Sequence, residues 1–242
     1  LPEGVGSSGE TSMPIFTPEE LAELGKDFPE LIMEALDRGD IEEARRWCQR
    51  HAESKNMIHD VYVHWVTQLM SIIHRDCGEP AAVDAIRSLV DFVGEQTIET
   101  KDRIMRDSGL KAWIEASMDI WRQHGSYPGV EVEEDEEKVT VRLHSCGSGG
   151  KMINAGCFDG PDAYARMKQP GPHTWGEADV PIYCSHCALA HELMPLEALG
   201  LGGQLWVHEK PFPRRPGDPC VHHFYKDAGA IPARYVRRFE TE

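Results

Sequence analysis

The hydrophobic pattern of this chain changes near Lys138, and this change limits the folds open to it. Before that residue, apolar side chains recur at the three- and four-residue spacing of amphipathic helices. After it, the segments 139–144, 204–209 and 221–225 alternate apolar and polar residues, as half-buried strands do. We therefore predict the α+β class, with an N-terminal helical bundle packed on a small C-terminal mixed α/β unit of several strands.

The same signals predict four segments. Residues 1–12 are rich in Gly and Ser and predict a disordered tail, and residues 13–128 predict a helical domain. Residues 129–138 predict an acidic linker, and residues 139–242 predict a Cys/His-rich α+β domain. Within these segments, capping signals predict helix starts at Thr17-Pro18-Glu19-Glu20 and at Asp40-Ile41-Glu42-Glu43. We expect a long helix over about 55–76 and further helices over about 79–92, 110–124 and 188–199. Residues 158–180 predict a long irregular stretch.

The charge of the chain restricts its partners. The 242 residues carry a net charge of −16, and the excess lies in the first half, where 14 basic residues face 30 acidic ones up to Lys138. Neither half is basic, so nucleic acid is not an expected partner. The apolar runs are too short for a membrane span, and no secretion signal opens the chain, so we expect a cytoplasmic protein without membrane contact. An amphipathic face of the helical bundle could form a homo-oligomer or could cover the second half of the chain.

Cysteine and histidine are concentrated in the segment after Lys138. This segment holds five of the seven cysteines and seven of the twelve histidines. Without a secretion signal, these cysteines indicate reduced thiols or metal ligands. Cys184 and Cys187 can direct two thiolates at one ion across a tight turn, and His191 lies one helical turn further on. We predict a zinc ion on Cys184, Cys187, His191 and Cys220. The alternatives are an iron–sulfur cluster on the cysteines at 146, 184, 187 and 220, or buried thiols beside hydrogen-bonded histidines.

A glycine-rich turn, Gly147-Ser148-Gly149-Gly150, follows Cys146 directly. Backbone N–H groups of such a turn can point inward and hold a carboxylate or an oxyanion, so we predict substrate binding by Gly147, Ser148, Gly149 and Gly150. A plain flexible turn is the alternative. Cys146 beside these donors is a candidate nucleophile or a metal ligand.

Acid–base candidates come from both halves. In the long helix, Asp60 and His64 are four residues apart and can pair, with the carboxylate orienting the imidazole. Their alternative interpretation is the solvated edge of an otherwise apolar helix. His144 and Glu192 are the candidates of the second half.

The segments 181–194 and 214–226 are similar to the tail of the L-2-amino-thiazoline-4-carboxylic acid hydrolase-like family. The resemblance is carried by Cys184, Gly217, Asp218, Cys220, Phe224 and Tyr225, whereas Cys187 stands where that family usually has an acidic residue. It implies hydrolytic opening of a C–N bond in a small cyclic amidine-like molecule.

Together, these patterns predict a metal-dependent hydrolase or lyase acting on a small polar molecule, with zinc lowering the pKa of a bound water. One alternative is a small-molecule sensor with a structural metal, since the tail also resembles vinyl-reductase-like domains. Another is a metal-free enzyme with Cys146 as the nucleophile.

Overall fold

The computed structural model describes residues 15–126, 129–203 and 206–239, so the tail predicted at 1–12 lies outside the described residues. The chain divides into two compact units, residues 1–55 and 56–242. The described part of the first unit holds the helices α1 (Pro18–Leu24) and α2 (Phe28–Asp37) and the start of α3 (Ile41–Cys77). Both predicted helix starts are confirmed, because Thr17 forms a capping box with Glu20, and Asp40 Oδ1 accepts the Glu43 N–H at 2.9 Å.

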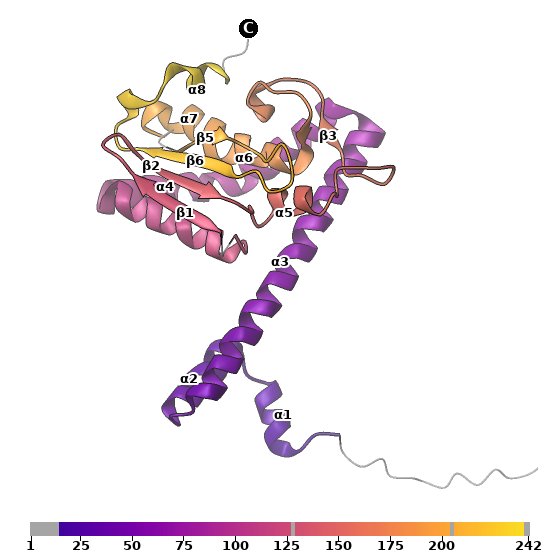
Figure 1. Ribbon diagram of the computed structural model, residues 1–242, viewed down its shortest axis with the longest axis vertical. Coiled ribbons are helices and arrows are strands. Elements are labelled where there is room, and N and C mark those ends of the chain that lie inside the picture. Colours follow the sequence, from indigo (N-terminus) through magenta and orange to yellow (C-terminus); the bar gives the residue numbers. More distant parts are fainter. Residues whose placement is uncertain (1–14, 127–128, 204–205, 240–242) are drawn as a thin grey trace, which may run out of the picture. The chain divides into compact units, whose positions relative to one another are not determined.

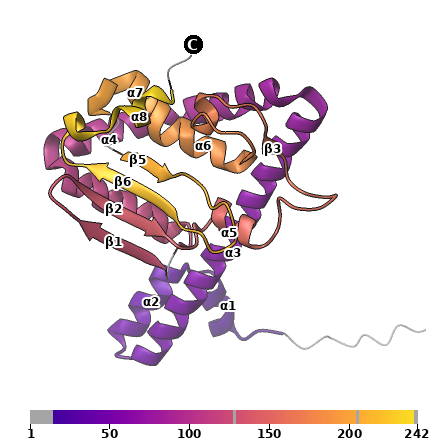
Figure 2. The same ribbon diagram turned by 45° about the horizontal axis from the view of Figure 1, so that its top comes forward.

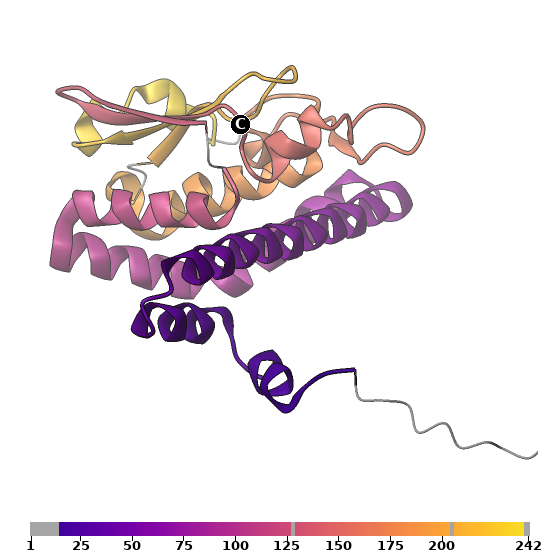
Figure 3. The same cartoon turned by 60° about the horizontal axis from the view of Figure 1, so that its bottom comes forward.

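Two long helical stretches, most of α3 and all of α4, lie in the second unit. α3 is continuous and begins well before the predicted residue 55. α4 (Glu79–Gln123) is broken at Gly109, whose φ of 79° and ψ of −179° only glycine adopts readily. Figure 3 shows the chain reversing there, so that the two arms of α4 run side by side. The ammonium of Lys101 on the first arm lies 5.3 Å from the ring centre of Trp113 on the second.

The strands form an antiparallel sheet in the order β1-β2-β6-β5 (Figure 1). Their bounds are Val130–Glu134 for β1, Lys138–Leu143 for β2, Trp206–Lys210 for β5 and Cys220–Tyr225 for β6. The acidic linker predicted at 129–138 is therefore wrong: Val132 of β1 pairs with Val141 of β2. Asp135 forms the turn between these strands by accepting the N–H groups of Glu137 and Lys138, each at 2.8 Å. The acidic side chains on β1 are solvent-exposed. Their charge suggested a linker, although Val130 and Val132 alternate with acidic residues as in a strand.

The sheet is covered on both faces. Trp113 and Trp121 of α4 pack with Leu143 and Phe224 in one buried cluster. On the opposite face, Tyr225 packs with the short helix α8 (Ala233–Arg237). The α+β prediction is confirmed.

A helical run over residues 182–199 packs against α4 and β5, and the short helix α5 precedes it in the chain (Figure 2). This run confirms the helix predicted over 188–199, and it tolerates Pro195 because that residue lies at the start of α7. The bounds are Gly149–Asn154 for α5, Arg166–Met167 for β3, Val180–Pro181 for β4, Ile182–Cys184 for η2, Ser185–Cys187 for α6, Ala188–Leu193 for the π-helical η3 and Met194–Leu199 for α7. The short 3₁₀ turns are η1 (Pro172–Thr174), η4 (Gly200–Gly202) and η5 (Ala228–Ala230).

In the described ranges, no helix has the length of apolar sequence that crossing a bilayer requires.

Candidate functional site

A cavity of about 320 Å³ in the second unit gathers most of the cysteine and histidine side chains noted in the sequence. Its walls come from α4, the turn after β2, the helical run 182–199 and strands β5 and β6. The cysteines and histidines that line it are Cys146, Cys184, Cys187, Cys220, His124, His186, His191, His208 and His222. All seven cysteines of the chain are free thiols.

Three of these side chains form a compact group that could hold a metal ion. The ligand atoms of His186, Cys187 and His191 all lie within 4.8 Å of one another. His186 Nε2 is 3.5 Å from Cys187 Sγ. Two such ligands of one tetrahedral zinc ion, at about 2.1 Å and 2.3 Å from the metal, would be about 3.6 Å apart. The observed separation is therefore compatible with two ligands of a shared ion, and it is also that of a thiol–imidazole hydrogen bond.

The orientation of His186 also suits a metal ligand. Its Nδ1 is 2.5 Å from the carbonyl oxygen of Tyr183, which can only accept a hydrogen bond. The proton is thus on Nδ1, and Nε2 presents its lone pair beside Cys187. A carbonyl that fixes the tautomer in this way is the usual neighbour of a metal-bound imidazole.

Burial keeps the three groups uncharged before a metal binds. It raises the pKa of the Cys187 thiol well above its ordinary value and lowers the pKa of His186 and of His191. The imidazoles are ready to donate their lone pairs, whereas the thiol must lose a proton when a metal binds.

The predicted ligand set is only partly brought together. Cys187 and His191 belong to the compact group, but Cys184 and Cys220 lie elsewhere in the cavity wall. The Cys220 thiol donates to the carbonyl of Pro211 at 3.2 Å, and Cys184 Sγ packs beneath the backbone of Gly149.

His186 is the candidate ligand that the sequence interpretation missed. It lies in the short helix α6, whereas His191 lies in the π-helical η3 that follows, and their ring centres are 6.1 Å apart. The i, i+4 rule of an α-helix does not select this pair. The spacing His-Cys-x-x-x-His was the available signal.

The glycine-rich turn is shaped by close packing. A Cβ on Gly147 would lie 1.6 Å from the His124 carbonyl oxygen, and one on Gly149 would lie 2.8 Å from Cys184 Sγ. Real Cβ atoms do not approach other atoms so closely, so glycine is required there for steric reasons. Gly149, Gly150 and Ser148 line the cavity together with Cys146, so they remain candidates for substrate contact.

Ser148 is the polar side chain of this turn. Its hydroxyl lies 3.2 Å from His59 Nε2 and shares a hydrogen bond with Tyr183. His59 in turn lies 3.4 Å from Asp60 through Nδ1. The cavity wall therefore contains a hydroxyl held by an imidazole.

The predicted Asp60–His64 pair does not form. Asp60 binds Lys151 and His59, whereas His64 Nδ1 is 2.8 Å from the hydroxyl of Tyr164. Both side chains of α3 face residues of the second half of the chain but lie outside the cavity lining. They do not pair because each has a nearer partner on the segment 151–164.

His144 lies at the surface, where its Nε2 is 3.0 Å from Glu131 Oε1. The strand predicted over 139–144 ends at Leu143, so His144 and Cys146 both belong to the following turn. Only Cys146 lines the cavity.

Glu192 is fully buried behind the cavity wall. Its Oε1 accepts the indole N–H of Trp175 at 2.8 Å, the backbone N–H of His208 at 3.0 Å and the His208 ring at 2.6 Å. Its Oε2 is paired with the guanidinium of Arg238. Burial raises the pKa of the Glu192 carboxyl, while the cation and the N–H donors favour the carboxylate. Glu192 therefore positions His208 and has no direct access to the cavity.

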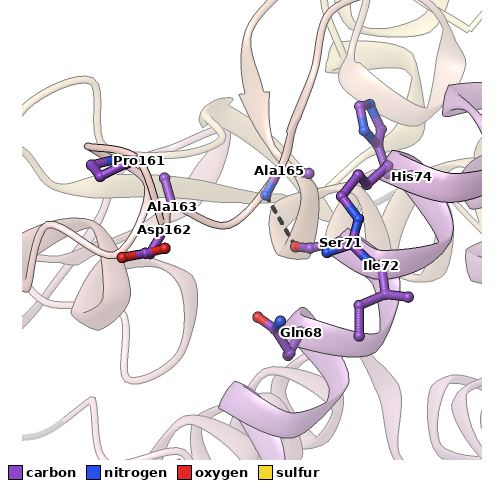
Figure 4. A pocket seen from close by; sticks show the side chains of 9 residues that line it. Gln68, Ser71, Ile72, His74, Pro161, Asp162, Ala163 and Ala165 are labelled. Carbon is purple, nitrogen blue, oxygen red and sulfur yellow. Dashed lines mark hydrogen bonds between the residues drawn. The ribbon is translucent and has the colours of Figure 1, made fainter.

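A second hollow, of about 330 Å³, lies between α3 and the loop at residues 161–165 (Figure 4). Ser71 Oγ accepts the Ala165 N–H there at 3.0 Å, and Gln68 lies on the same side of the helix (Figure 4). Its lining contains His74, but no cysteine and no member of the compact His–Cys–His group. Among the described residues, the compact His–Cys–His group and the cysteines beside it therefore line the first cavity and not this hollow.

No family model, curated protein or solved structure matches this chain in comparisons with known proteins.

Proposed function

We propose that this protein is a metal-dependent hydrolase of a small polar molecule, with zinc on His186, Cys187 and His191 and water at the fourth position. The observation that carries this proposal is the compact His–Cys–His group in the wall of a cavity. Three protein ligands with one open position are typical of catalytic zinc, whereas structural sites have four. The ion would lower the pKa of the bound water to about 7.

The cavity limits the substrate class. A volume of about 320 Å³ admits only a small molecule. The resemblance of the segments 181–194 and 214–226 to the amino-thiazoline-carboxylate hydrolase-like tail suggests that the bond opened is the C–N bond of a small ring. In hydrolysis water is the nucleophile, which a zinc ion held by the three side chains would activate, and the imidazoles of the cavity could carry the proton.

Metal analysis of protein purified without chelator tests the proposal. We expect about one zinc per chain, and we expect Cys187→Ala and His191→Ala to lose it. Cys157→Ala is the matched control, because its thiol lies outside the cavity lining and the variant should keep its zinc. A metal-free folded protein that hydrolyses small cyclic amides or amidines would instead favour a thiol nucleophile at Cys146.

A brown protein containing iron and sulfide would point to a cluster. The four cysteines at 146, 184, 187 and 220 all line the cavity, so this outcome has a structural basis. Zinc that is retained without any hydrolytic activity over a panel of cyclic amides, amidines and esters would favour a sensor with a structural metal.

A further inference from the structure

We propose that His208 and His222 form a paired acceptor and donor that binds the amide-like edge of a small cyclic molecule. That this molecule is then hydrolysed rests on the proposed function. Both residues line the cavity, and they lie opposite each other on neighbouring strands β5 and β6. Their ring centres are 4.4 Å apart.

Each imidazole has one unsatisfied nitrogen. Considering the residues that the structure describes, Nε2 of His208 and Nε2 of His222 are buried without a hydrogen-bond partner. The exposed fractions of the two residues are 0 % and 4 %. Buried polar groups in folded proteins are nearly always hydrogen-bonded, so two adjacent exceptions in a cavity wall indicate a ligand.

The contacts of His208 fix which of its nitrogens carries the proton. Glu192 Oε1 already accepts N–H groups from Trp175 and from the His208 backbone, so it acts as an acceptor toward the ring as well. The proton of the neutral ring is therefore on Nδ1. Nε2 of His208 therefore keeps its lone pair, without a hydrogen-bond partner among the described residues, as an acceptor.

The contacts of His222 fix the opposite tautomer. The indole Nε1–H of Trp206 lies 3.1 Å from His222 Nδ1, and an indole N–H can only donate. Nδ1 is thus the lone-pair nitrogen, and Nε2 carries the proton. His222 therefore offers the unpartnered Nε2–H as a donor.

One acceptor beside one donor selects the ligand. In a lactam the N–H and the C=O point to the same side of the ring, so the N–H can donate to His208 while the C=O accepts from His222. A carboxylate would set an oxygen against the His208 lone pair, and an ammonium group would set its hydrogens against the His222 N–H. The pair therefore favours a neutral cyclic amide or the equivalent amidine edge.

The tautomers can be measured directly in the zinc-loaded protein. Long-range ¹H–¹⁵N spectra of the histidine rings should show His208 protonated on Nδ1 and His222 protonated on Nε2. Two rings in the same tautomer, or a doubly protonated ring at pH 7, would overturn the proposal. This measurement uses the wild-type chain, so it holds even where a variant fails to fold.

Binding is tested with 2-pyrrolidinone and with N-methyl-2-pyrrolidinone, which has the same ring but no N–H donor. We expect the first to shift both ring spectra saturably and the second to bind about tenfold more weakly. His208→Phe and His222→Phe should remove this preference. His223→Gln is the control, because His223 contacts Thr140 and Glu209. Equal affinity for the two probes would overturn the proposal.

The same titration in chelator-treated protein separates the two proposals. If the protein still binds 2-pyrrolidinone more tightly than the N-methyl compound but never contains a metal, the proposed metal-dependent hydrolase is refuted and the proposed histidine pair is supported. If zinc is present and hydrolysis occurs without any preference between the probes, the pair fails and the hydrolase stands.

Discussion

Replacing Glu192 by Gln should destabilise the protein more than almost any other polar substitution. The carboxylate is 0 % exposed, and its Oε2 neutralises Arg238. An amide of the same shape keeps one acceptor oxygen for Trp175 and His208, but it turns an NH₂ group or a neutral oxygen toward the guanidinium. A buried charge that loses its partner costs about 3–5 kcal/mol. For a domain of this size, each kcal/mol lowers the melting temperature by about 2–4 °C, so we expect a decrease of about 6–20 °C.

Urea unfolding of Glu192→Gln, Arg238→Met and the double variant measures this effect. The double variant should be more stable than the sum of the single losses predicts, by about 1–3 kcal/mol, because it leaves no unpaired charge. Glu197→Gln is the control, since Glu197 pairs with Arg87 at the surface and its loss should cost less than about 1 kcal/mol. A loss below about 1 kcal/mol for Glu192→Gln, or strict additivity in the cycle, would refute the reasoning.

Three further predictions concern the turn, a buried lysine and the metal group. Gly147→Ala should lower the melting temperature markedly, because its Cβ would lie 1.6 Å from the His124 carbonyl oxygen, whereas Gly202→Ala, with open space around it, should be nearly neutral by the same thermal scan. Burial lowers the pKa of Lys101 to about 8 from 10.5 in the unfolded chain, so the unfolded state binds more protons between these values. Stability should therefore rise with pH from about 8 to 10.5, by up to about 3 kcal/mol, and unfolding titrations of Lys101→Met should lack this rise. Burial raises the pKa of the Cys187 thiol, which must lose its proton to bind zinc. The zinc dissociation constant should therefore fall about tenfold for each pH unit between 7 and 8.5, as measured by competition with a chelating dye. A dissociation constant that does not change with pH would contradict this.

The sequence predicted the elements with strong local signals. Capping signals located the starts of α1 and α3, and alternation located β2 and β6, because these signals depend on neighbours only a few residues apart. β1 was mistaken for a linker because its acidic side chains face solvent. Its pairing with β2 depends on backbone hydrogen bonds, which do not require apolar residues on both faces.

The site was predicted less completely, for a geometric reason. The sequence indicated Cys187 and His191 but not His186, because the two histidines are five residues apart and the i, i+4 spacing of an α-helix does not select them. His208 and His222 carried no motif. Their importance comes from strand pairing, which places side chains that are distant in sequence opposite each other.

The closeness of His186, Cys187 and His191 along the chain bears on how the protein would acquire the proposed metal ion. The residues that pair β2 with β6 lie 77 to 87 positions apart in the chain, a long-range contact whose loop costs more entropy to close than a local one. The three ligands need only one helical turn, so an unfolded or newly synthesised chain could already chelate zinc. An ion that also binds the unfolded chain adds less to equilibrium stability than its affinity for the native state suggests. The metal would then act earlier, as a local nucleus around which the wall of the cavity assembles.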